Sequence, residues 1–184
     1  MIAWHGSDTR FDRFDLAFVK CGEGSMVRGH GAYLAEARAC AERYRDILAR
    51  RTGLPGYLYK VQLAPELGDF LDQEKLLADQ SAKVRHALGI TDATLERYWK
   101  TTDLLERGRL RRPFSEIGRK CYARLANQHG NGLKASAWLL ARGIPGMAYL
   151  DQVSRKIGRG TRNLVVFYAA LITILQVDGG EPGR

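Results

Sequence analysis

The alternation of apolar and polar residues predicts short strands near both ends of the chain. Residues 2–5 form an apolar run closed by a glycine and a serine, and residues 56–63 are rich in aromatic and β-branched side chains. Both features are typical of strands. Three later apolar runs, 147–150, 163–167 and 171–175, also predict strands. The short gap between the last two runs favours a hairpin.

A helix is predicted between the first two strands. Its periodicity runs from about residue 36 to residue 51, where Gly53 and Pro55 provide the stop signal. Because Cys40 lies on the apolar face, we expect its thiol to resist alkylation, whereas Cys21, in a glycine-rich loop, should react quickly. The residues on that apolar face are Cys40, Tyr44, Ile47 and Leu48.

The middle of the chain, from about residue 73 to residue 141, is predicted to be helical. Ser115 is placed to cap one helix, and Gly143 followed by Pro145 ends the last one, at 133–141. Strands on both sides of a helical stretch favour an α+β fold over a doubly wound sheet. Two amphipathic faces support the helices, one made of Leu95, Tyr98, Trp99, Thr102 and Leu105, the other of Ile117, Cys121, Tyr122 and Leu125.

Length and charge suggest one basic domain. A chain of 184 residues with 45% hydrophobic and 27% charged residues is typical of a single globular domain, residues 1–184. Lys and Arg outnumber Asp and Glu by 29 to 20, and the net charge of +9 favours an anionic partner. Seven basic residues lie between 107 and 124 beside one acid, Glu116. This segment is either a solvated helix face or a binding patch.

Several common chemistries leave no motif in the sequence. No Rossmann loop, P-loop or nucleophile elbow occurs. The four histidines and three cysteines lack metal-ligand spacing, so we expect no metal site. No apolar run is long enough to span a membrane, and no Sec-type signal peptide is present. We therefore expect a cytoplasmic protein with free thiols, and delivery into a target cell by a signal-independent route is compatible with this.

Two short patterns stand on either side of a long glycine-rich loop, residues 11–31. The first is Trp-His-Gly-Ser at 4–7, and the second is Gly-His-Gly-Ala-Tyr-Leu-Ala-Glu at 29–36. Together they resemble the ADP-ribosyltransferase superfamily in its diphtheria-toxin and poly(ADP-ribose) polymerase branch. The amino-acid sequences of three further segments, 11–15, 22–24 and 143–150, are similar to those of the ADP-ribosyltransferase domains of phage and mobile-element polyvalent proteins.

The resemblance covers about residues 3–63 and 114–176, and it implies both a fold and a reaction. The fold would be a split antiparallel β-sheet, two sheets packed over an NAD cleft, with a helical insert at about 73–112. The reaction would use NAD as co-substrate and transfer ADP-ribose to a macromolecular acceptor, protein or nucleic acid, with release of nicotinamide.

The resemblance also implies roles for individual residues. His5 would hydrogen-bond the adenosine-side ribose, and the Gly6 backbone would pair with the nicotinamide amide, which excludes a side chain there. Ser7 would belong to the same NAD-binding strand end. Tyr33 would stack on the nicotinamide ring and Tyr44, eleven residues later, would complete the sandwich. A tyrosine face suits a flat cationic ring.

Asn163 stands where the family pattern has its catalytic glutamate. The catalytic residues would then be His5, Tyr33 and Asn163, with Asn163 orienting the ribose 2′-hydroxyl but supplying no charge. Loss of one preorganised electrostatic partner costs about 3 kcal/mol, or about a hundredfold in rate. If another acid does this work, Glu36 and Asp151 are the first candidates. A second departure is Ala41, where family members often carry a hydroxyl residue.

Other interpretations of the same residues stay open. The protein could be a module that binds NAD, ADP-ribose or nucleic acid without catalysis, or a structural component of a phage or mobile element held to nucleic acid by its arginines. His5 could be an ordinary turn histidine, and Tyr33 and Tyr44 plain core aromatics. The arginines considered for the NAD pyrophosphate are Arg10, Arg13 and Arg28, on charge alone.

Overall fold

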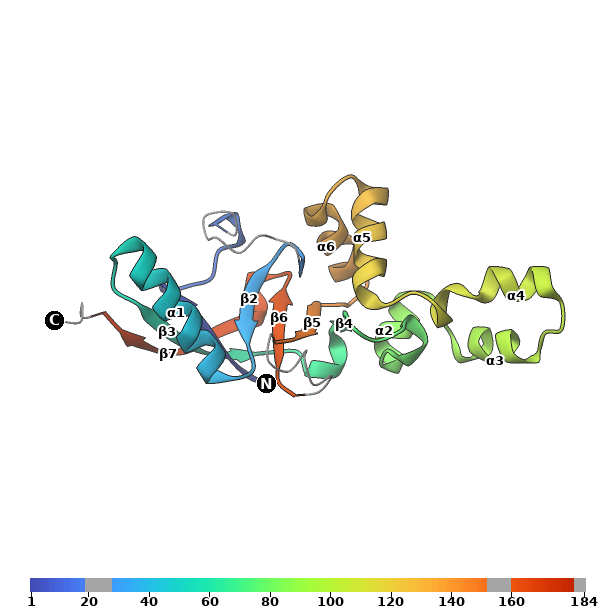
Figure 1. The fold of residues 1–184 in the computed structure, drawn as a ribbon, viewed down its shortest axis with the longest axis horizontal. Helices are drawn as coiled ribbons and strands as arrows, with labels where there is room; N and C mark the ends of the chain where they lie inside the picture. The colour runs from blue at the N-terminus through green and yellow to red at the C-terminus, as the bar shows by residue number, and fades with distance from the viewer. Residues whose placement is uncertain (19–27, 152–159, 181–184) are drawn as a thin grey trace.

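The described residues of the computed structural model, 1–18, 28–151 and 160–180, form an α+β fold (Figure 1). Cys21 and the loop glycines at 22 and 24 lie outside these residues. Within them, seven strands make one sheet in the order β4-β5-β6-β2-β1-β3-β7. The strands are β1 (Ile2–Ser7), β2 (Ala32–Ala35), β3 (Tyr57–Leu63), β4 (Leu71–Asp72), β5 (Gly146–Leu150), β6 (Arg162–Val166) and β7 (Ile172–Gly179).

The sheet is mixed and continuous, so the expectation of two purely antiparallel sheets was wrong. β4 and β5 run parallel, because a long helical segment carries the chain back between them. The predicted hairpin between the last two strands was also wrong. β6 lies between β5 and β2, where Leu164, Val165 and Val166 are fully buried, whereas the half-exposed β7 forms the far edge beside β3.

The sheet opens at the seam between β1 and β2. One residue pair, Trp4 with Ala35, joins these two strands, whereas six pairs join β1 to β3 and four join β2 to β6. The halves β4-β5-β6-β2 and β1-β3-β7 therefore meet at a single point of the ladder.

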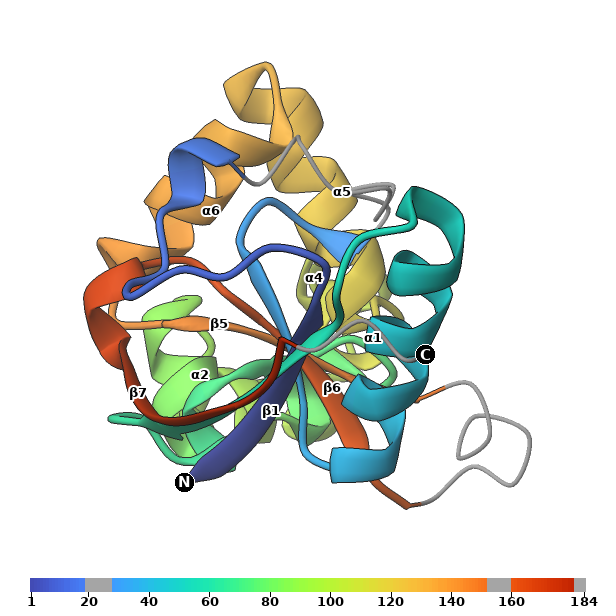
Figure 2. The same cartoon turned by 90° about the vertical axis from the view of Figure 1, so that its left-hand side faces the viewer.

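Three helices, α1, α5 and α6, pack against the sheet, and the other three described helices, α2, α3 and α4, lie between β4 and α5 in the chain (Figures 1 and 2). The expected α1 is confirmed, and Gly53 ends it in the left-handed conformation at φ 69°. The expected Ser115 cap was wrong, because α5 begins at Gly118 and its N-cap is Ile117. A Cβ at Gly118 would lie 2.1 Å from the Asp72 carbonyl oxygen, so the start of this helix packs tightly against β4. The helices are α1 (Arg38–Thr52), α2 (Ala82–Ala87), α3 (Asp92–Lys100), α4 (Leu104–Leu110), α5 (Gly118–His129) and α6 (Gly132–Leu140).

Two large core clusters cover the sheet. The first joins α5 and α6 to the strands and includes Tyr122, Leu139 and Met147, all buried. The second, centred on Tyr59 and Leu164, is covered by loops and short 3₁₀ turns. The central strands β5 and β6 therefore contribute alternate residues to the two clusters.

The buried face of α1 differs from the predicted one. Ala41 is its buried residue, while Tyr44 is 53% and Ile47 46% exposed. The reason lies in β1, since a Cβ on Gly6 would come within 2.2 Å of the Ala41 carbonyl oxygen. The helix backbone crosses the strand so closely that only a small residue fits at the contact.

The expected helical insert contains α2, α3 and α4, and the last two have little contact with the core, which α3 touches through the partly buried Leu95. Figure 1 shows α3 and α4 standing clear of the sheet as an antiparallel pair. Neither helix has a buried residue, and Trp99 and Leu105 of the predicted amphipathic face are 66% and 77% exposed. The prediction of one continuous face was wrong, because α3 ends at Lys100 and α4 begins at Leu104, with Thr102 between them. No helix among the described residues is long and apolar enough to cross a membrane.

Candidate functional site

The three residues predicted to be catalytic lie on three neighbouring strands. His5 is on β1 and Tyr33 is on β2, across the seam, while Asn163 is the second residue of β6. In the ladder Asn163 pairs with Ala35 of β2 on one side and with Tyr149 of β5 on the other. The sheet order thus brings together positions that are as much as 158 residues apart in the sequence, from His5 to Asn163.

A hydrogen bond across the seam fixes the His5 ring. Its Nδ1 lies 2.8 Å from the Tyr33 carbonyl oxygen, and because a carbonyl only accepts, Nδ1 carries the proton. Burial lowers the pKa of His5 and so keeps the ring neutral. The lone pair is then on Nε2, which can accept a hydrogen bond from a hydroxyl group. The rings that surround the imidazole are those of Phe11, Phe14 and Tyr59.

Tyr33 is fixed through its hydroxyl group. The hydroxyl donates to the Gly29 carbonyl oxygen at 2.8 Å, and burial raises the pKa of Tyr33 to about 12. Gly29 has φ 131°, and a Cβ there would meet the Met147 side chain at 2.1 Å, so the turn closes on Tyr33 only with glycine. Tyr33 packs against the first core cluster, whereas the rings around His5 belong to the second. The two predicted NAD-binding side chains therefore point to opposite faces of the sheet, where their strands meet at the seam.

Tyr149 is a site residue that the sequence did not single out. It is buried on β5, directly opposite Asn163, its partner in the ladder. Burial raises the pKa of Tyr149 well above its ordinary value. The Arg28 guanidinium lies over its ring, 5.4 Å from the centroid. Tyr149 could have been identified only from the register of β5 against β6, and a single sequence does not give that register.

Asn163, Cys40 and Asp151 meet at one corner of the sheet. The Cys40 Sγ lies 3.5 Å from the Asn163 Oδ1, and burial together with the negative charge of Asp151 raises the pKa of that thiol. Asp151 pairs through its backbone N–H with the Thr161 carbonyl, which places it diagonally across from Asn163 on the same face as Tyr149. Its carboxylate accepts the Thr161 hydroxyl. Asp151 therefore carries negative charge close to Asn163.

Glu36, the other acid suggested by the sequence, has a structural role. Its backbone N–H donates to the Arg162 carbonyl at 2.8 Å, and its Oε2 accepts from the Arg162 N–H at 2.9 Å. Both bonds hold the start of β6 against the end of β2. The corner acid is accordingly Asp151 rather than Glu36.

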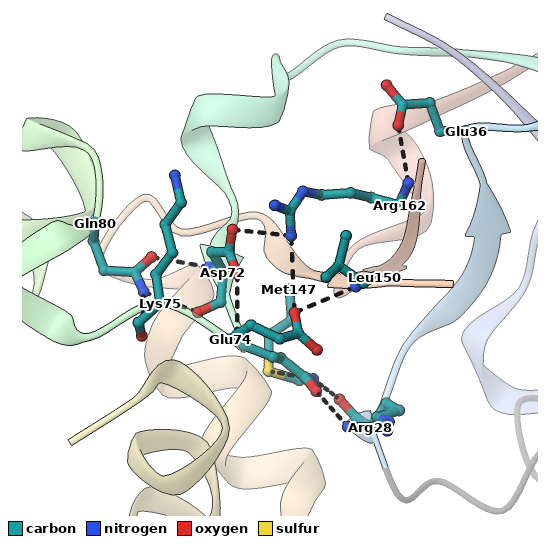
Figure 3. Close-up of polar contacts among 10 residues, drawn as sticks. Arg28, Glu36, Asp72, Glu74, Lys75, Gln80, Met147, Leu150 and Arg162 are labelled. Atoms are coloured by element: carbon teal, nitrogen blue, oxygen red, sulfur yellow. Dashed lines mark hydrogen bonds and ion pairs between the residues drawn. The ribbon is translucent and has the colours of Figure 1, made fainter. Parts of the chain in front are cut away.

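A polar network beside this corner ties β4 to β6 and to the end of the glycine-rich loop (Figure 3). The Arg162 Nη1 lies 3.0 Å from the Asp72 Oδ2 and 3.8 Å from the Glu74 Oε2, which also accepts from the Leu150 N–H. Burial raises the pKa of Glu74. Gln73 donates to the Arg28 carbonyl at 2.7 Å, and this bond holds Arg28 over Tyr149.

The other predicted NAD-binding residues have local roles as well. Gly6 excludes a side chain because α1 crosses it, a sufficient reason without a ligand. Ser7 is buried and its Oγ accepts from the Thr9 N–H at 3.1 Å, which stabilises the turn after β1. Tyr44 lies on α1 near enough to Tyr33 to affect its titration, and its ring is exposed.

A hollow of about 450 Å³ lies beside the turn before β2, between the first 3₁₀ turn (Leu16–Phe18) and α6. Its walls include the apolar side chains of Leu133, Leu140 and Phe167 and the polar side chains of His30 and Ser136. Arg10 and Arg13, two of the pyrophosphate candidates, are exposed after β1, whereas Arg28 is held at Tyr149. Within the residues described, no three His, Cys, Asp or Glu side chains gather as metal ligands would.

Comparisons with known proteins add no family assignment to this geometry. No family model matches the chain, and neither a curated protein nor a solved structure matches it.

Proposed function

We propose that this protein binds NAD at the seam between β1 and β2 and transfers ADP-ribose to a macromolecular acceptor, releasing nicotinamide. The observation that carries the proposal is that His5, Tyr33 and Asn163 lie on the adjacent strands β1, β2 and β6, with His5 hydrogen-bonded to the Tyr33 carbonyl across the seam. A dinucleotide is long enough to contact side chains on both sides of such a seam.

The proposed contacts of His5, Tyr33 and Tyr44 with NAD would each use a ring atom or ring face that forms no hydrogen bond with the described residues. The Nε2 of His5, an acceptor, would take the hydrogen bond of a ribose hydroxyl. The Tyr33 ring, fixed through its hydroxyl, would stack on nicotinamide, and the exposed Tyr44 ring would cover the other face. The positive charge of the nicotinamide ring in NAD is attracted to both aromatic faces.

The transfer step follows from this arrangement. The bond between the ribose C1′ and the nicotinamide nitrogen breaks, and its electron pair neutralises the positive ring. The ribose becomes an oxocarbenium ion, which a nucleophile of the acceptor attacks with loss of a proton. Asn163 would orient the 2′-hydroxyl, and Asp151 beside it would supply the negative charge that stabilises the oxocarbenium ion.

Ligand binding can be tested by thermal denaturation with and without NAD. NAD at a hundredfold excess over its Kd should stabilise the native state by about 2.7 kcal/mol, because it binds that state alone. Tyr33→Ala should remove the shift, while Tyr168→Ala, at an exposed tyrosine in the turn after β6, should retain it. A native protein that shows no shift at millimolar NAD would refute the NAD site.

Catalysis is tested by nicotinamide release. Asn163→Glu should raise the rate by up to about a hundredfold, and Asp151→Asn should lower it by a similar factor, since each changes one charge beside the developing cation. Asp79→Asn, at an exposed acid in the 3₁₀ turn after β4, is the matched control and should release nicotinamide at the native rate. Equal rates in the native protein and in Asp151→Asn would exclude Asp151 from the step.

A second function, NAD or ADP-ribose binding without transfer, is favoured by one observation, the uncharged Asn163 at the catalytic position. It predicts a thermal shift with NAD and no nicotinamide release by the native protein. Release that depends on Tyr33 would decide in favour of the transferase.

A further inference from the structure

The pair of helices that stands clear of the sheet has its own surface chemistry. We define the α3–α4 arm as residues 91–114, from the cap of α3 to the 3₁₀ turn after α4. In Figure 1 it forms the end of the molecule opposite α1. Its distance from the seam means that its role can be considered independently of the proposed function.

The acids of the arm are all engaged within the protein. Glu106 pairs with Arg97, Glu96 lies 3.1 Å from the Lys100 ammonium, and Asp92 lies 2.7 Å from the Arg85 guanidinium. Asp103 caps α4 by accepting two backbone N–H groups. The arm carries six basic residues against these four acids, and four of its exposed cations form no ion pair with the described residues. These are Arg107, Arg109, Arg111 and Arg112, and exposed Arg119 and Lys120 continue the run on α5.

An aromatic cluster lies among these cations. Tyr98 and Phe114 stack at 4.0 Å, and Trp99 meets Phe114 edge-on at 5.3 Å. The Arg107 guanidinium lies 5.2 Å from the centre of the Tyr98 ring. Trp99 is fixed by these contacts and is still 66% exposed. An exposed, oriented indole beside arginines is the combination that binds stacked bases and phosphates together.

We propose that the α3–α4 arm is a binding site for single-stranded nucleic acid. Unpaired bases would stack on Trp99, and the backbone phosphates would follow the exposed arginines. In a duplex the base faces are covered by their neighbours, so a projecting tryptophan has little to stack on. Leu104 and Leu105, 80% and 77% exposed, add apolar surface that bases and sugars can cover. A second copy of the arm would bring like charges together, which disfavours self-association.

The test measures fluorescence anisotropy with a labelled 20-nucleotide single strand of mixed sequence. Trp99→Ala should weaken binding about tenfold or more, the usual cost of one lost base stack. The triple variant Arg109→Gln, Arg111→Gln, Arg112→Gln should weaken it further. It should also reduce the slope of log K against log salt by about 2, since each neutralised phosphate contributes about 0.7. Replacing the same three residues with lysine should restore most of the affinity.

A control variant separates a site from general attraction to a basic protein. Arg43→Gln, Arg50→Gln and Lys134→Gln remove three exposed charges from α1 and α6, and this variant should bind the strand nearly as well as the native protein. An equal loss in the control would overturn the proposal. So would tighter binding of a 20-base-pair duplex, or binding only to vesicles that contain anionic lipid or to an acidic protein. Circular dichroism of every variant checks that α3 and α4 remain folded.

Discussion

The seam of the sheet and the α3–α4 arm have similar kinds of side chain in opposite environments. At the seam, His5 and Tyr33 are held by hydrogen bonds, and on the strands beside Tyr33, Tyr149 is buried and the Arg162–Asp72 pair is largely shielded from solvent. In the arm, Trp99 and Leu104 are exposed, and four arginines at 107, 109, 111 and 112 face solvent without an ion pair to a described acid. The seam's polar groups are fixed by protein contacts, whereas the arm's outer groups are available to a partner. Burial, rather than residue type, distinguishes a site built into the fold from a surface that needs a partner.

Truncating a leucine should give the largest difference in unfolding free energy between the arm and the core cluster that packs on Tyr33. Leu139 of α6 is fully buried, so Leu139→Ala should lower the free energy of unfolding by about 2–5 kcal/mol. Leu104→Ala, in the arm, should change it by no more than about 0.5 kcal/mol. Urea denaturation of both variants measures this, and equal losses would show that the arm packs on the body in solution.

Glycine substitutions should give the next largest contrast. Gly6→Ala places a Cβ 2.2 Å from the Ala41 carbonyl oxygen and 2.6 Å from the Arg45 nitrogen. Because both are backbone atoms, α1 must move, and we expect a loss of about 3 kcal/mol. Gly108→Ala in α4 meets nothing within 4 Å and should stabilise that helix by up to about 1 kcal/mol.

These glycines also test why residue 6 must be small. The resemblance attributes its small size to the nicotinamide contact, and the structure gives a packing reason. If Gly6→Ala keeps its native melting temperature and loses only NAD binding, the ligand explanation holds and the close helix crossing does not.

The sequence predicted those parts of the fold that depend on local pattern. The strands at 2–5 and 56–63 and the helix from 36 to 51 are confirmed within a few residues, because periodicity and stop signals act locally. Strand pairing is not local, since β6 and the segment that follows it occupy distant places in the sheet. The predicted hairpin failed for that reason.

The same limit explains what was missed at the site. Two short motifs were enough to single out His5 and Tyr33, and the strand alignment to single out Asn163. The neighbours of Asn163, Tyr149 and Cys40, arrive from another strand and from a helix, so their proximity depends on register and on helix rotation. Periodicity placed Tyr44 on the apolar face of α1, but the close crossing at Gly6 turned Ala41 inward instead.

Cysteine labelling should separate the corner of the site from the core by rate. Cys121 is fully buried and burial raises its pKa to about 11, so at pH 8 its thiolate fraction is about a hundredfold below that of an ordinary thiol. Cys40, half-buried at the corner, should react faster than Cys121, and Cys21 in the glycine-rich loop fastest. Mass spectrometry after timed alkylation gives the order.

NAD should slow the labelling of Cys40 and leave Cys121 unchanged, because only Cys40 adjoins Asn163. No protection of Cys40 at saturating NAD would place the ligand elsewhere. The arm contains no cysteine, so a single strand bound there should alter neither rate.

The smallest effect we expect is a pH dependence of stability that comes from His5. Burial lowers the folded-state pKa of His5 below the ordinary histidine value of about 6.5. Between the ordinary pKa and the lower folded-state pKa, His5 binds a proton in the unfolded chain but not in the folded chain. The free energy of unfolding therefore decreases as the pH falls through this range. This contribution is fully present above pH 6.5 and is lost as the pH approaches the folded-state pKa.

His5→Gln should reduce the loss of stability between pH 7.5 and pH 5.5, because an amide can still donate to the Tyr33 carbonyl and does not titrate. His86→Gln, at an exposed histidine on α2, should keep the native pH dependence, since His5 is unchanged in it. NAD affinity should weaken over the same pH range in the native protein, because protonation turns the Nε2 of His5 from an acceptor into a donor. The arm contains no histidine, so its affinity for a single strand should show no such step. If instead both affinities change together between pH 7.5 and pH 5.5, a global loss of structure is responsible, and His5 is not the titrating group at the seam.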